Sequence, residues 1–588
     1  MYFCRKTSAW KGCRNPLLIL SAAAIVIVAS YPIGAHLGFG LVDDAYISMR
    51  YARNWAEGIG PFFNPGERVE GYTNFLWTFF LFAGAQQGIE PAQMAEQMGR
   101  VCLGLVIPVA FSLGFCITRS WAVAVFAVAL LLSDPGVWAW SLSGLETPLL
   151  TLLFTTVFAT WMREGGGIRR ELCLALLVSS AALTRPEGAA IFVYLLVAAL
   201  FPSPRPSPGG RGGFLDGHRQ DAGATLTFSH PDRLLKAKGE NIPSFRRKPE
   251  TGEHLAGAGG DTCVAPAIIF IGVFIAVFGS YLLWRRWTYG LWLPNSFYAK
   301  HGFAGPALWW RGLRYVLDVC VAHPFWLLIP LGCFVGAWRD RAFIRLLGFS
   351  LFYLIIVVLS GGDHYTLGRF CVPVVPILSI LAAMGLQNAC RQISLVQKVI
   401  AQPVWKGLPA TVSVVFAVLC GVLNAGWGFE YRDGGYFHRS EIGWAEGWGR
   451  IGEIWREEVE PDTVIAVVTA GALPYISSLP TIDILGINDH HISQRDVPIG
   501  GGVAGHEKGD ADYVLRRRPQ RIQIAPMLLF QRIRTRYTEV PLEDVLTYPA
   551  QIELANHPVF QKSYSFVTQK TRFGYLSYHR YSNEGMKN

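Results

Sequence analysis

Two adjacent carboxylates, Asp43 and Asp44, directly follow the first long apolar run of the sequence. A carboxylate within hydrogen-bond reach of a hydroxyl group can act as its general base. Adjacent carboxylates raise each other's pKa unless a cation or hydrogen-bond donors share the site. The pair therefore indicates either a reactive site or, with about equal weight, a helix cap at a membrane surface.

A helix is predicted to hold this pair. Within residues 43–58, the apolar Ala45, Met49 and Ala52 recur at three- and four-residue spacing, and charged residues such as Arg50 form another stripe. An amphipathic helix of this kind is suited to lying on a membrane surface. The two carboxylates would then be fixed at the edge of the membrane.

The composition indicates a membrane protein. Only 16% of the 588 residues are charged and 51% are apolar, whereas soluble proteins carry about 25% charged residues. The net charge of +10 comes from short basic clusters between apolar runs, which favours loop anchoring over nucleic-acid binding. Runs near the ~20 residues that cross a bilayer lie at about 16–38, 72–88, 98–117, 121–140, 147–163, 170–184, 187–202, 264–284, 321–338, 344–360, 369–388 and 408–427.

Charge decides which runs cross the membrane. If 72–88 spans it, most later basic loops fall outside, against the positive-inside rule. If that run lies in the outer interface, the loops that carry Arg119, Arg163 and Arg341 fall inside, although the basic outer loop at 285–320 still counts against the rule. The balance predicts eleven spans, a cytoplasmic N-terminus and an outer C-terminus.

The chain is predicted to divide after residue 427. Residues 1–427 form the transmembrane domain, with a first outer loop at 39–97 and a Pro- and Gly-rich loop at 203–263 that is expected to be disordered in the cytoplasm. Residues 428–588 lack long apolar runs and are predicted to be one periplasmic α/β domain. One helix there carries glutamates among regularly spaced tryptophans: Glu441, Glu446 and Glu453 with Trp444, Trp448 and Trp455.

The segment from Asp43 to Trp77 is the most specific part of the sequence. Its second half, Asn64–Trp77, predicts a turn and another interfacial helix. The segment resembles the first outer loop of GT-C superfamily membrane glycosyltransferases, closest to the family of the mycobacterial terminal arabinofuranosyltransferase. The resemblance implies a GT-C fold in the bacterial inner membrane with a catalytic aspartate in this loop. We expect Asp44 to be the base, with Asp43 as second choice.

Ionisable groups at other outer span ends point to the same site. Each alone more often marks the end of a span, but their convergence on one side favours a functional site. Loops 481–491 and 505–508 also resemble the periplasmic domain of this family, and we expect the first to be a polar loop rather than a metal site. The predicted substrate-binding residues are Glu146, Arg185, Glu187, Asn295, Lys300 and Arg369, with Arg50 and Tyr72 from the first loop.

These groups suit sugar transfer from a polyprenyl phosphate to a glycan or lipid acceptor. One base is enough for direct displacement with inversion, and Arg185, Lys300 and Arg369 are the expected phosphate partners. A divalent cation (Mg²⁺, Mn²⁺ or Ca²⁺) is an open alternative, with Asp43, Asp363 and His364 as ligands. The resemblance implies arabinofuranose as the sugar, although relatives that use hexoses leave this open.

Three other functions compete with this hypothesis. A lipid or glycan transporter or flippase would also be polytopic, but such proteins tend to show internal repeats and mid-membrane broken helices, and we find no repeat. A glycan-binding scaffold would not need the acidic pair. A phosphoethanolamine transferase would carry a dense metal-ligand set in its soluble domain. Transferase assays with polyprenyl-phosphate sugars, with and without a chelator, separate all three.

Overall fold

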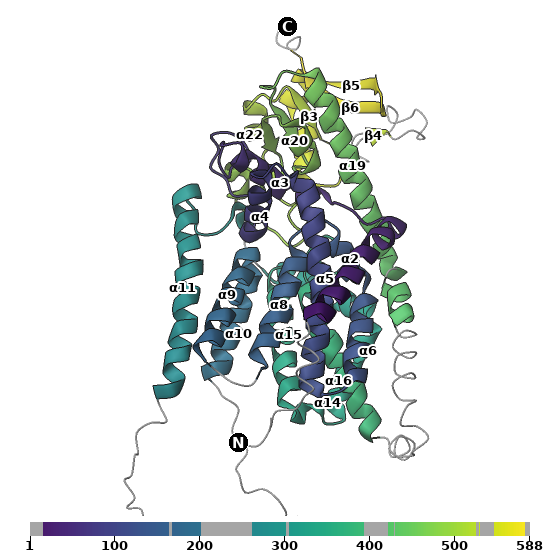
Figure 1. The fold of residues 1–588 in the computed structure, drawn as a ribbon. Coiled ribbons are helices and arrows are strands. Elements are labelled where there is room, and N and C mark those ends of the chain that lie inside the picture. The colour runs from purple at the N-terminus through teal and green to yellow at the C-terminus, as the bar shows by residue number, and fades with distance from the viewer. Residues whose placement is uncertain are drawn as a thin grey trace, which may run out of the picture.

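The computed structural model describes residues 16–163, 167–200, 261–300, 305–392, 421–428, 430–524, 528–529 and 546–582. Almost all of the predicted loop at 203–263 and most of the run at 408–427 lie outside these residues. Apolar helices form a bundle, and an α/β domain sits on one end of it (Figure 1). We call the end that carries this domain the outer end.

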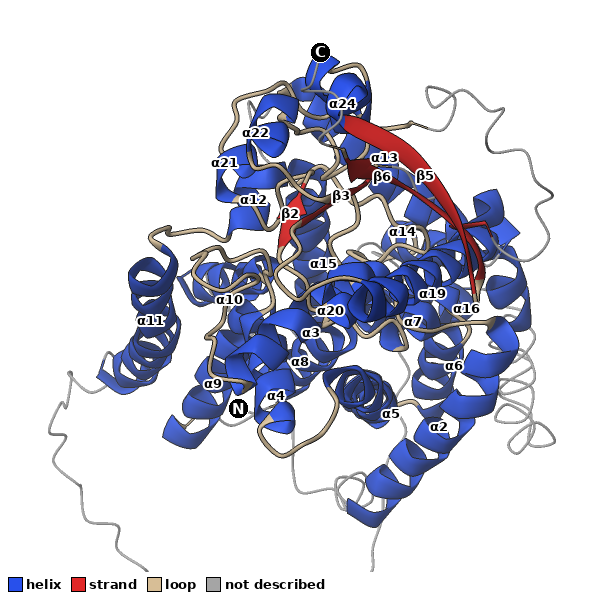
Figure 2. Cartoon of the chain, turned by 90° about the horizontal axis from the view of Figure 1, so that it is seen from above, coloured by secondary structure: helices blue, strands red, loops and turns tan. Residues whose placement is uncertain are grey.

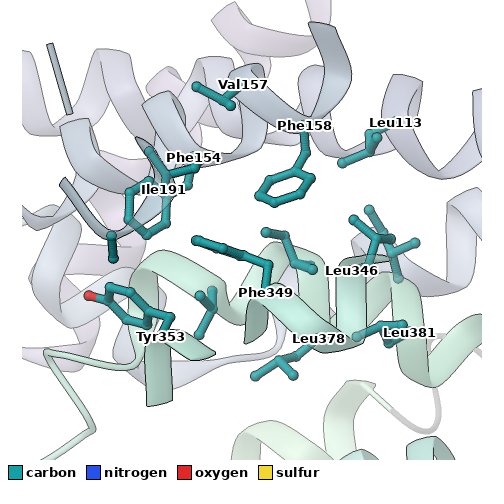
Figure 3. Close-up of a cluster of buried hydrophobic side chains, with 14 of the residues drawn as sticks. Leu113, Phe154, Val157, Phe158, Ile191, Leu346, Phe349, Tyr353, Leu378 and Leu381 are labelled. Carbon is teal, nitrogen blue, oxygen red and sulfur yellow. The ribbon is translucent and has the colours of Figure 1, made fainter. Parts of the chain in front are cut away.

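The bundle is built from the apolar runs of the sequence. Its helices are α2 (Pro16–Leu37), α5 (Pro91–Thr118), α6 (Trp121–Leu132), α7 (Pro135–Ser141), α8 (Thr147–Trp161), α9 (Ile168–Thr184), α10 (Ala189–Leu200), α11 (Asp261–Tyr289), α15 (Arg341–Leu359) and α16 (Val375–Gln392). Aromatic and aliphatic side chains of α8, α10, α15 and α16, among them Phe154, Phe349 and Leu381, interlock in its core (Figure 3). Such close packing fixes the helices relative to one another.

The predicted number of eleven spans stays a prediction, because most of the run at 408–427 lies outside the described residues. Five helices in the described part of the chain are long and apolar enough to cross a membrane, or seven if two bent pairs each count as one span. The runs at 147–163 and 187–202 form apolar helices of fewer than 18 residues, which are shorter than these candidate spans. Helix α4 (Phe75–Ala85) has only 11 residues, so the run at 72–88 is too short to span, in agreement with the charge argument.

The second half of the predicted outer loop at 285–320 contains a helix that the sequence did not reveal. Residues Pro306–Ala322 form helix α13, which turns by 93° into the short helices η2 (Pro324–Leu327) and α14 (Leu328–Phe334). Helix α13 is amphipathic, with Trp309 and Trp310 exposed on one side. Its charged residues hid it from a search for apolar runs, because a helix that lies along a membrane surface keeps a polar face.

The basic connections lie at the end of the bundle away from the α/β domain. The α5–α6, α8–α9 and α14–α15 connections, which carry Arg119, Arg163 and Arg339, are at that end (Figure 1). The positive-inside rule therefore continues to predict that this end faces the cytoplasm. The acidic pair begins α3 (Asp43–Ala56) at the outer end.

The α/β domain has a mixed six-stranded sheet in the order β2-β1-β3-β6-β4, with β5 paired to β6. Strands β2, β1 and β3 are parallel, and β6 runs antiparallel to β3. The strands are β1 (Ile465–Val467), β2 (Thr481–Asp483), β3 (Arg521–Gln523), β4 (Leu528–Leu529), β5 (Tyr564–Thr571) and β6 (Gly574–Tyr581). The helices are α19 (Gly434–Glu458), α20 (Ala472–Ser477), α21 (His490–Ser493), α22 (Ala511–Arg516), α23 (Pro549–Ala555) and α24 (Pro558–Ser563).

The parallel strands position the part of this domain that faces the bundle. Ligands of α/β proteins bind outside the carboxyl ends of parallel strands. Here the segments after β1 and β2 and the last residue of β3 line a cavity together with the start of α3. Seen from above, the strands lie over the middle of the bundle, and α11 stands at one edge (Figure 2).

Candidate active site

The two adjacent carboxylates have different surroundings. Asp43 is 7% exposed, and its Oδ1 and Oδ2 accept hydrogen bonds from the backbone N–H groups of Ala472 (2.7 Å) and Gly471 (3.2 Å). These N–H groups belong to the start of α20, so Asp43 caps a helix of the C-terminal domain from outside it. Burial raises the pKa of Asp43 to about 7.

Asp44 instead faces open space. Its side chain is 28% exposed and lies on the wall shared by two cavities. Arg369 Nη1 lies 3.5 Å from Asp44 Oδ2. Although burial raises the pKa of Asp44, the positive charges of Arg369 and His364 outweigh this and bring it below its ordinary value. Asp44 is therefore ionised at neutral pH and can accept a proton.

Arg369 is held by a second carboxylate. Its Nε lies 2.5 Å from Asp363 Oδ2, and both side chains are at most 4% exposed. The guanidinium also stacks over Tyr365 and Phe370. Burial opposes ionisation of Asp363, but Arg369 brings its pKa far below the ordinary value. Only Nε and Nη1 of Arg369 pair with side chains in the described part of the chain, which leaves donors for a further anion.

Arg185 is the centre of a second charge network. Its Nη1 lies 2.5 Å from Glu146 Oε1, and its Nε and Nη2 make a bidentate pair with Glu187. Glu146 Oε2 in turn accepts a hydrogen bond from Asn74 Nδ2 at 2.7 Å, and Asn74 Oδ1 accepts one from Ser48 of α3 at 2.9 Å. The network therefore connects Ser48 of α3 to the outer ends of α8 and α9.

The membrane-side cavity has a volume of about 480 Å³ and contains most of the predicted cations. Arg185, Lys300 and Arg369 lie on its wall with Tyr72. Its lining includes apolar residues of α12 (Asn295–Lys300) and α15: Phe297, Ile356 and Leu359, of which Phe297 and Leu359 are exposed. A partly exposed apolar wall beside fixed cations suits an amphiphilic anion.

Lys300 differs from the two arginines. No carboxylate lies within ion-pair distance of its Nζ among the residues that the structure describes, and it lines both cavities. Burial lowers the pKa of Lys300, and the neighbouring Arg369 lowers it further. A bound anion would supply the missing counter-charge.

The outer cavity, of about 410 Å³, lies between α3 and the C-terminal domain. It shares Asp44, Ile47, Lys300 and Ile487 with the membrane-side cavity. Glu441, Trp444 and Trp448 of α19 form one side, and His506 and Tyr548 line another part. Burial raises the pKa of Glu441 to about 7 and lowers that of His506 to about 4.

Two predicted substrate-binding residues have structural partners instead. Arg50 is 2% exposed and donates hydrogen bonds to the backbone oxygens of Phe63, Pro474 and Leu479. The amide of Asn295 is fully buried, donates to backbone oxygens after β2, and accepts from Ser493. Neither side chain lines the two cavities, so their prediction as substrate contacts is corrected. Both fasten the outer loops to the C-terminal domain.

The predicted metal ligands do not converge. Asp43 caps α20, whereas Asp363 and His364 lie with Arg369. Within the described ranges, no group of three or more His, Cys, Asp or Glu side chains could hold a metal ion. The geometry therefore does not support Asp43 as a ligand beside Asp363 and His364, and a divalent cation remains a proposal to be tested with a chelator.

Sequence reasoning missed several residues of the site. Ser48 and Asn74 carry the hydrogen bonds between α3 and Glu146, and Glu70 forms a buried ion pair with Arg285 at 2.8 Å that fastens α11 to the first outer loop. Asn74 and Glu70 lie in the segment that suggested the family resemblance. The available signal for Glu70 was its position just before the apolar run at 72–88, because a carboxylate that becomes buried there needs a partner.

Two glycines permit close contact between the first outer loop and the C-terminal domain. A Cβ atom on Gly471 would lie 2.0 Å from the backbone oxygen of Asp43, and one on Gly71 would lie 1.9 Å from Asn488 Oδ1. Any larger residue at these positions would push the two parts apart. The seam above α3 is therefore tightly packed.

Comparisons with known proteins now bear on the fold. The crystal structure of ArnT from Cupriavidus metallidurans bound to undecaprenyl phosphate aligns over 98% of this chain and 99% of its own, with a TM-score of 0.50 and 13% sequence identity. This chain has the GT-C fold. The predicted fold class, a helical polytopic membrane protein with a C-terminal α/β domain, is thereby confirmed. A GT-C fold positions α3 and the two cavities at the outer end of the bundle.

Sequence matches are shorter. The terminal β-(1→2)-arabinofuranosyltransferase of Mycobacterium tuberculosis (strain ATCC 25618 / H37Rv) is 35% identical over 94 residues, which are 15% of this chain and 15% of that protein. The match confirms the predicted resemblance over this stretch alone. Residues 436–580, which extend from α19 into β6, match the family model described as Domain of unknown function (DUF8728).

Proposed function

We propose that this protein is an inverting glycosyltransferase that uses a polyprenyl-phosphate sugar, with Asp44 as the general base. The observation that carries the proposal is the position of Asp44 on the wall common to both cavities. A base between two binding sites can contact the groups that react when each site is filled.

The membrane-side cavity is the proposed donor site. The exposed apolar side chains of α12 and α15 on its wall can contact the prenyl chain, and Lys300 and Arg369 would hold the phosphate. Carboxylates fix the two arginines, Arg185 and Arg369, in position before the donor binds. Charge that is preorganised in this way stabilises a developing anion. The bound undecaprenyl phosphate named for the ArnT structure supports a carrier of this kind.

The outer cavity is the proposed acceptor site. A hydroxyl oxygen of the acceptor would attack the anomeric carbon of the donor sugar while Asp44 takes the hydroxyl proton. The bond between the anomeric carbon and the phosphate oxygen breaks, and its electron pair leaves with the polyprenyl phosphate. Lys300 and Arg369 stabilise that charge. One displacement inverts the configuration at the anomeric carbon.

The finer assignments follow from the resemblance and the charge pattern. The partial match to an arabinofuranosyltransferase supports arabinofuranose as the sugar. The basic connections at the far end of the bundle support an inner-membrane orientation with a cytoplasmic N-terminus and a periplasmic C-terminal domain. The acceptor would then be a glycan or lipid of the cell envelope.

Replacement of the base tests the proposal. Asp44→Asn should lower transfer from a polyprenyl-phosphate arabinose by at least about a hundredfold, in the range of lost acid–base catalysis. Binding of the carrier and thermal stability should remain nearly unchanged. The assay uses purified protein in sealed proteoliposomes, with and without a chelator, and Lys570→Met on exposed β5 as the control. Full activity of Asp44→Asn would refute the base, and lipid translocation without transfer would favour a flippase.

A further inference from the structure

One face of α19 is aimed at the outer cavity. Glu441, Trp444 and Trp448 follow one another at three- and four-residue spacing and all line this cavity. Residues three or four apart lie on the same side of a helix. Of the predicted row of glutamates and tryptophans on this helix, these three residues therefore face the outer cavity together.

The other members of that row have partners elsewhere. Glu453 pairs with Arg572 of the β5–β6 turn, and Glu446 lies 3.9 Å from Arg450 on the helix surface. Trp455 is fully buried in the core of the C-terminal domain. Trp444, in contrast, is 45% exposed. An exposed tryptophan on a cavity wall has no packing role that would explain it.

The chemistry of this face fits a sugar. Trp444 and Trp448 have ring centroids 6.5 Å apart and tilted by 40°, and the electron-rich face of an indole attracts the weakly positive C–H groups of a sugar ring. Glu441, one turn before Trp444, can accept hydrogen bonds from sugar hydroxyls. A volume of about 410 Å³ lies within the ~300–1,000 Å³ of small-molecule sites.

The charges of the cavity decide which sugars fit. Glu441 has no cation within ion-pair distance among the described residues, and the ionised Asp44 lies on the same cavity wall. Burial and Asp44 both disfavour the charged form of Glu441. A phosphate or carboxylate on the acceptor would add a further negative charge here. Of the basic groups on this wall, Lys300 is assigned to the donor phosphate and His364 lies 3.4 Å from a carboxylate oxygen of Asp363.

We propose that Glu441, Trp444 and Trp448 form the acceptor subsite, and that the acceptor is the uncharged end of a glycan. This inference rests on the proposed transferase function. It makes α19 the element that selects the acceptor, whereas the membrane-side cavity selects the donor. Trp444 stacks on the sugar ring and Glu441 orients its hydroxyls toward Asp44.

Two variants test the subsite with neutral arabino-oligosaccharides as the acceptor probe. Trp444→Ala should raise the acceptor KM roughly tenfold, the size expected for the loss of one aromatic stack, with donor KM unchanged. Glu441→Gln should raise the acceptor KM roughly threefold, because one amide end still accepts a hydrogen bond.

A matched control and a charged probe complete the experiment. Trp310→Ala removes another exposed tryptophan, which lies on α13, is 65% exposed and lines neither cavity. This variant should leave the acceptor KM unchanged. Phosphorylated oligosaccharides should be used at least tenfold less efficiently than neutral ones. Equal changes in Trp444→Ala and Trp310→Ala, a change in donor KM alone, or a preference for the phosphorylated probe would each overturn the subsite. Absence of transfer to both water and acceptor by the wild type would instead overturn the transferase function.

Discussion

The two cavities on either side of Asp44 differ in how their charged side chains are paired. In the membrane-side cavity two cations are held by carboxylates, Arg185 by Glu146 and Glu187 and Arg369 by Asp363. In the outer cavity Glu441 has no such partner among the described residues, and Trp444 is open to solvent. The membrane-side cavity therefore has cations fixed by ion pairs, whereas the outer cavity, as far as the structure describes it, has a carboxylate without an ion-pair partner and an exposed aromatic side chain.

This difference fits the two tasks that we propose. A leaving phosphate develops the same charge in every turnover, so fixed cations that need no reorganisation stabilise it best. A glycan end must be held by its ring and hydroxyls, for which stacking and hydrogen bonds suffice. Variants that affect one cavity should therefore leave the binding constant of the other substrate unchanged.

The largest effect should come from Lys300, the cation without a carboxylate partner in the described part of the chain. Lys300→Met should reduce kcat/KM for the polyprenyl-phosphate donor by about a hundredfold, which is the usual loss when one donor to a developing anion is removed. Steady-state kinetics with varied donor would measure this change. Lys570→Met provides the matched control, and an effect confined to the acceptor KM would break the comparison between the cavities.

A smaller effect is expected from the network that holds Arg185. Glu146→Gln replaces a charged partner 2.5 Å from Arg185 by an amide, while the bidentate pair with Glu187 remains. We expect the donor KM to rise about tenfold, the loss of roughly one charge-assisted hydrogen bond. Titration of donor at saturating acceptor would show it. A rise in acceptor KM of the same size would contradict separate roles for the cavities.

The smallest effect on sugar transfer is expected from Asp43, which lies where the first outer loop contacts the C-terminal domain. In the folded protein its carboxyl keeps a proton up to a pH of about 7, because burial raises its pKa from 3.8. Between these values the folded state binds more protons than the unfolded state. The contribution of Asp43 to the free energy of unfolding should therefore fall as pH rises through this range.

Asp43→Asn removes that titration while keeping one hydrogen-bond acceptor for α20. Melting temperatures measured from pH 5 to pH 8 should decline less steeply in Asp43→Asn than in the wild type. Part of the decline should persist, since burial also raises the pKa of Glu70 and Glu441 to about 7. Sugar transfer should be reduced far less than by Asp44→Asn. Identical pH profiles for the two proteins would show that Asp43 does not titrate in this range.

The parts of this molecule that follow from local patterns could be predicted. Apolar runs gave the bundle, the amphipathic spacing of residues 43–58 gave α3, and charge indicated that 72–88 does not span. Helix α13 was missed because its polar face interrupts the apolar run. A pattern search that assumes a transmembrane helix cannot detect one that lies along the surface.

Contacts between distant segments could not be predicted from one sequence. Arg50 and Asn295 were grouped with the substrate residues, yet each has hydrogen-bond partners in the C-terminal domain, roughly 200 to 430 positions away. The same distance hid the difference between Asp43 and Asp44. Neighbours in sequence share composition and spacing, but only the docked α20 distinguishes a capping carboxylate from an open one.

The glycine contacts at Gly71 and Gly471 set the spacing between the first outer loop and the C-terminal domain, and Gly71 also lines the membrane-side cavity. A methyl group at either position acts as a wedge between the first outer loop and the C-terminal domain, since it would meet oxygen atoms at about 2 Å. At Gly471 this wedge would press on the backbone of Asp43, directly before the proposed base Asp44. A larger residue there would therefore displace the base together with the C-terminal domain.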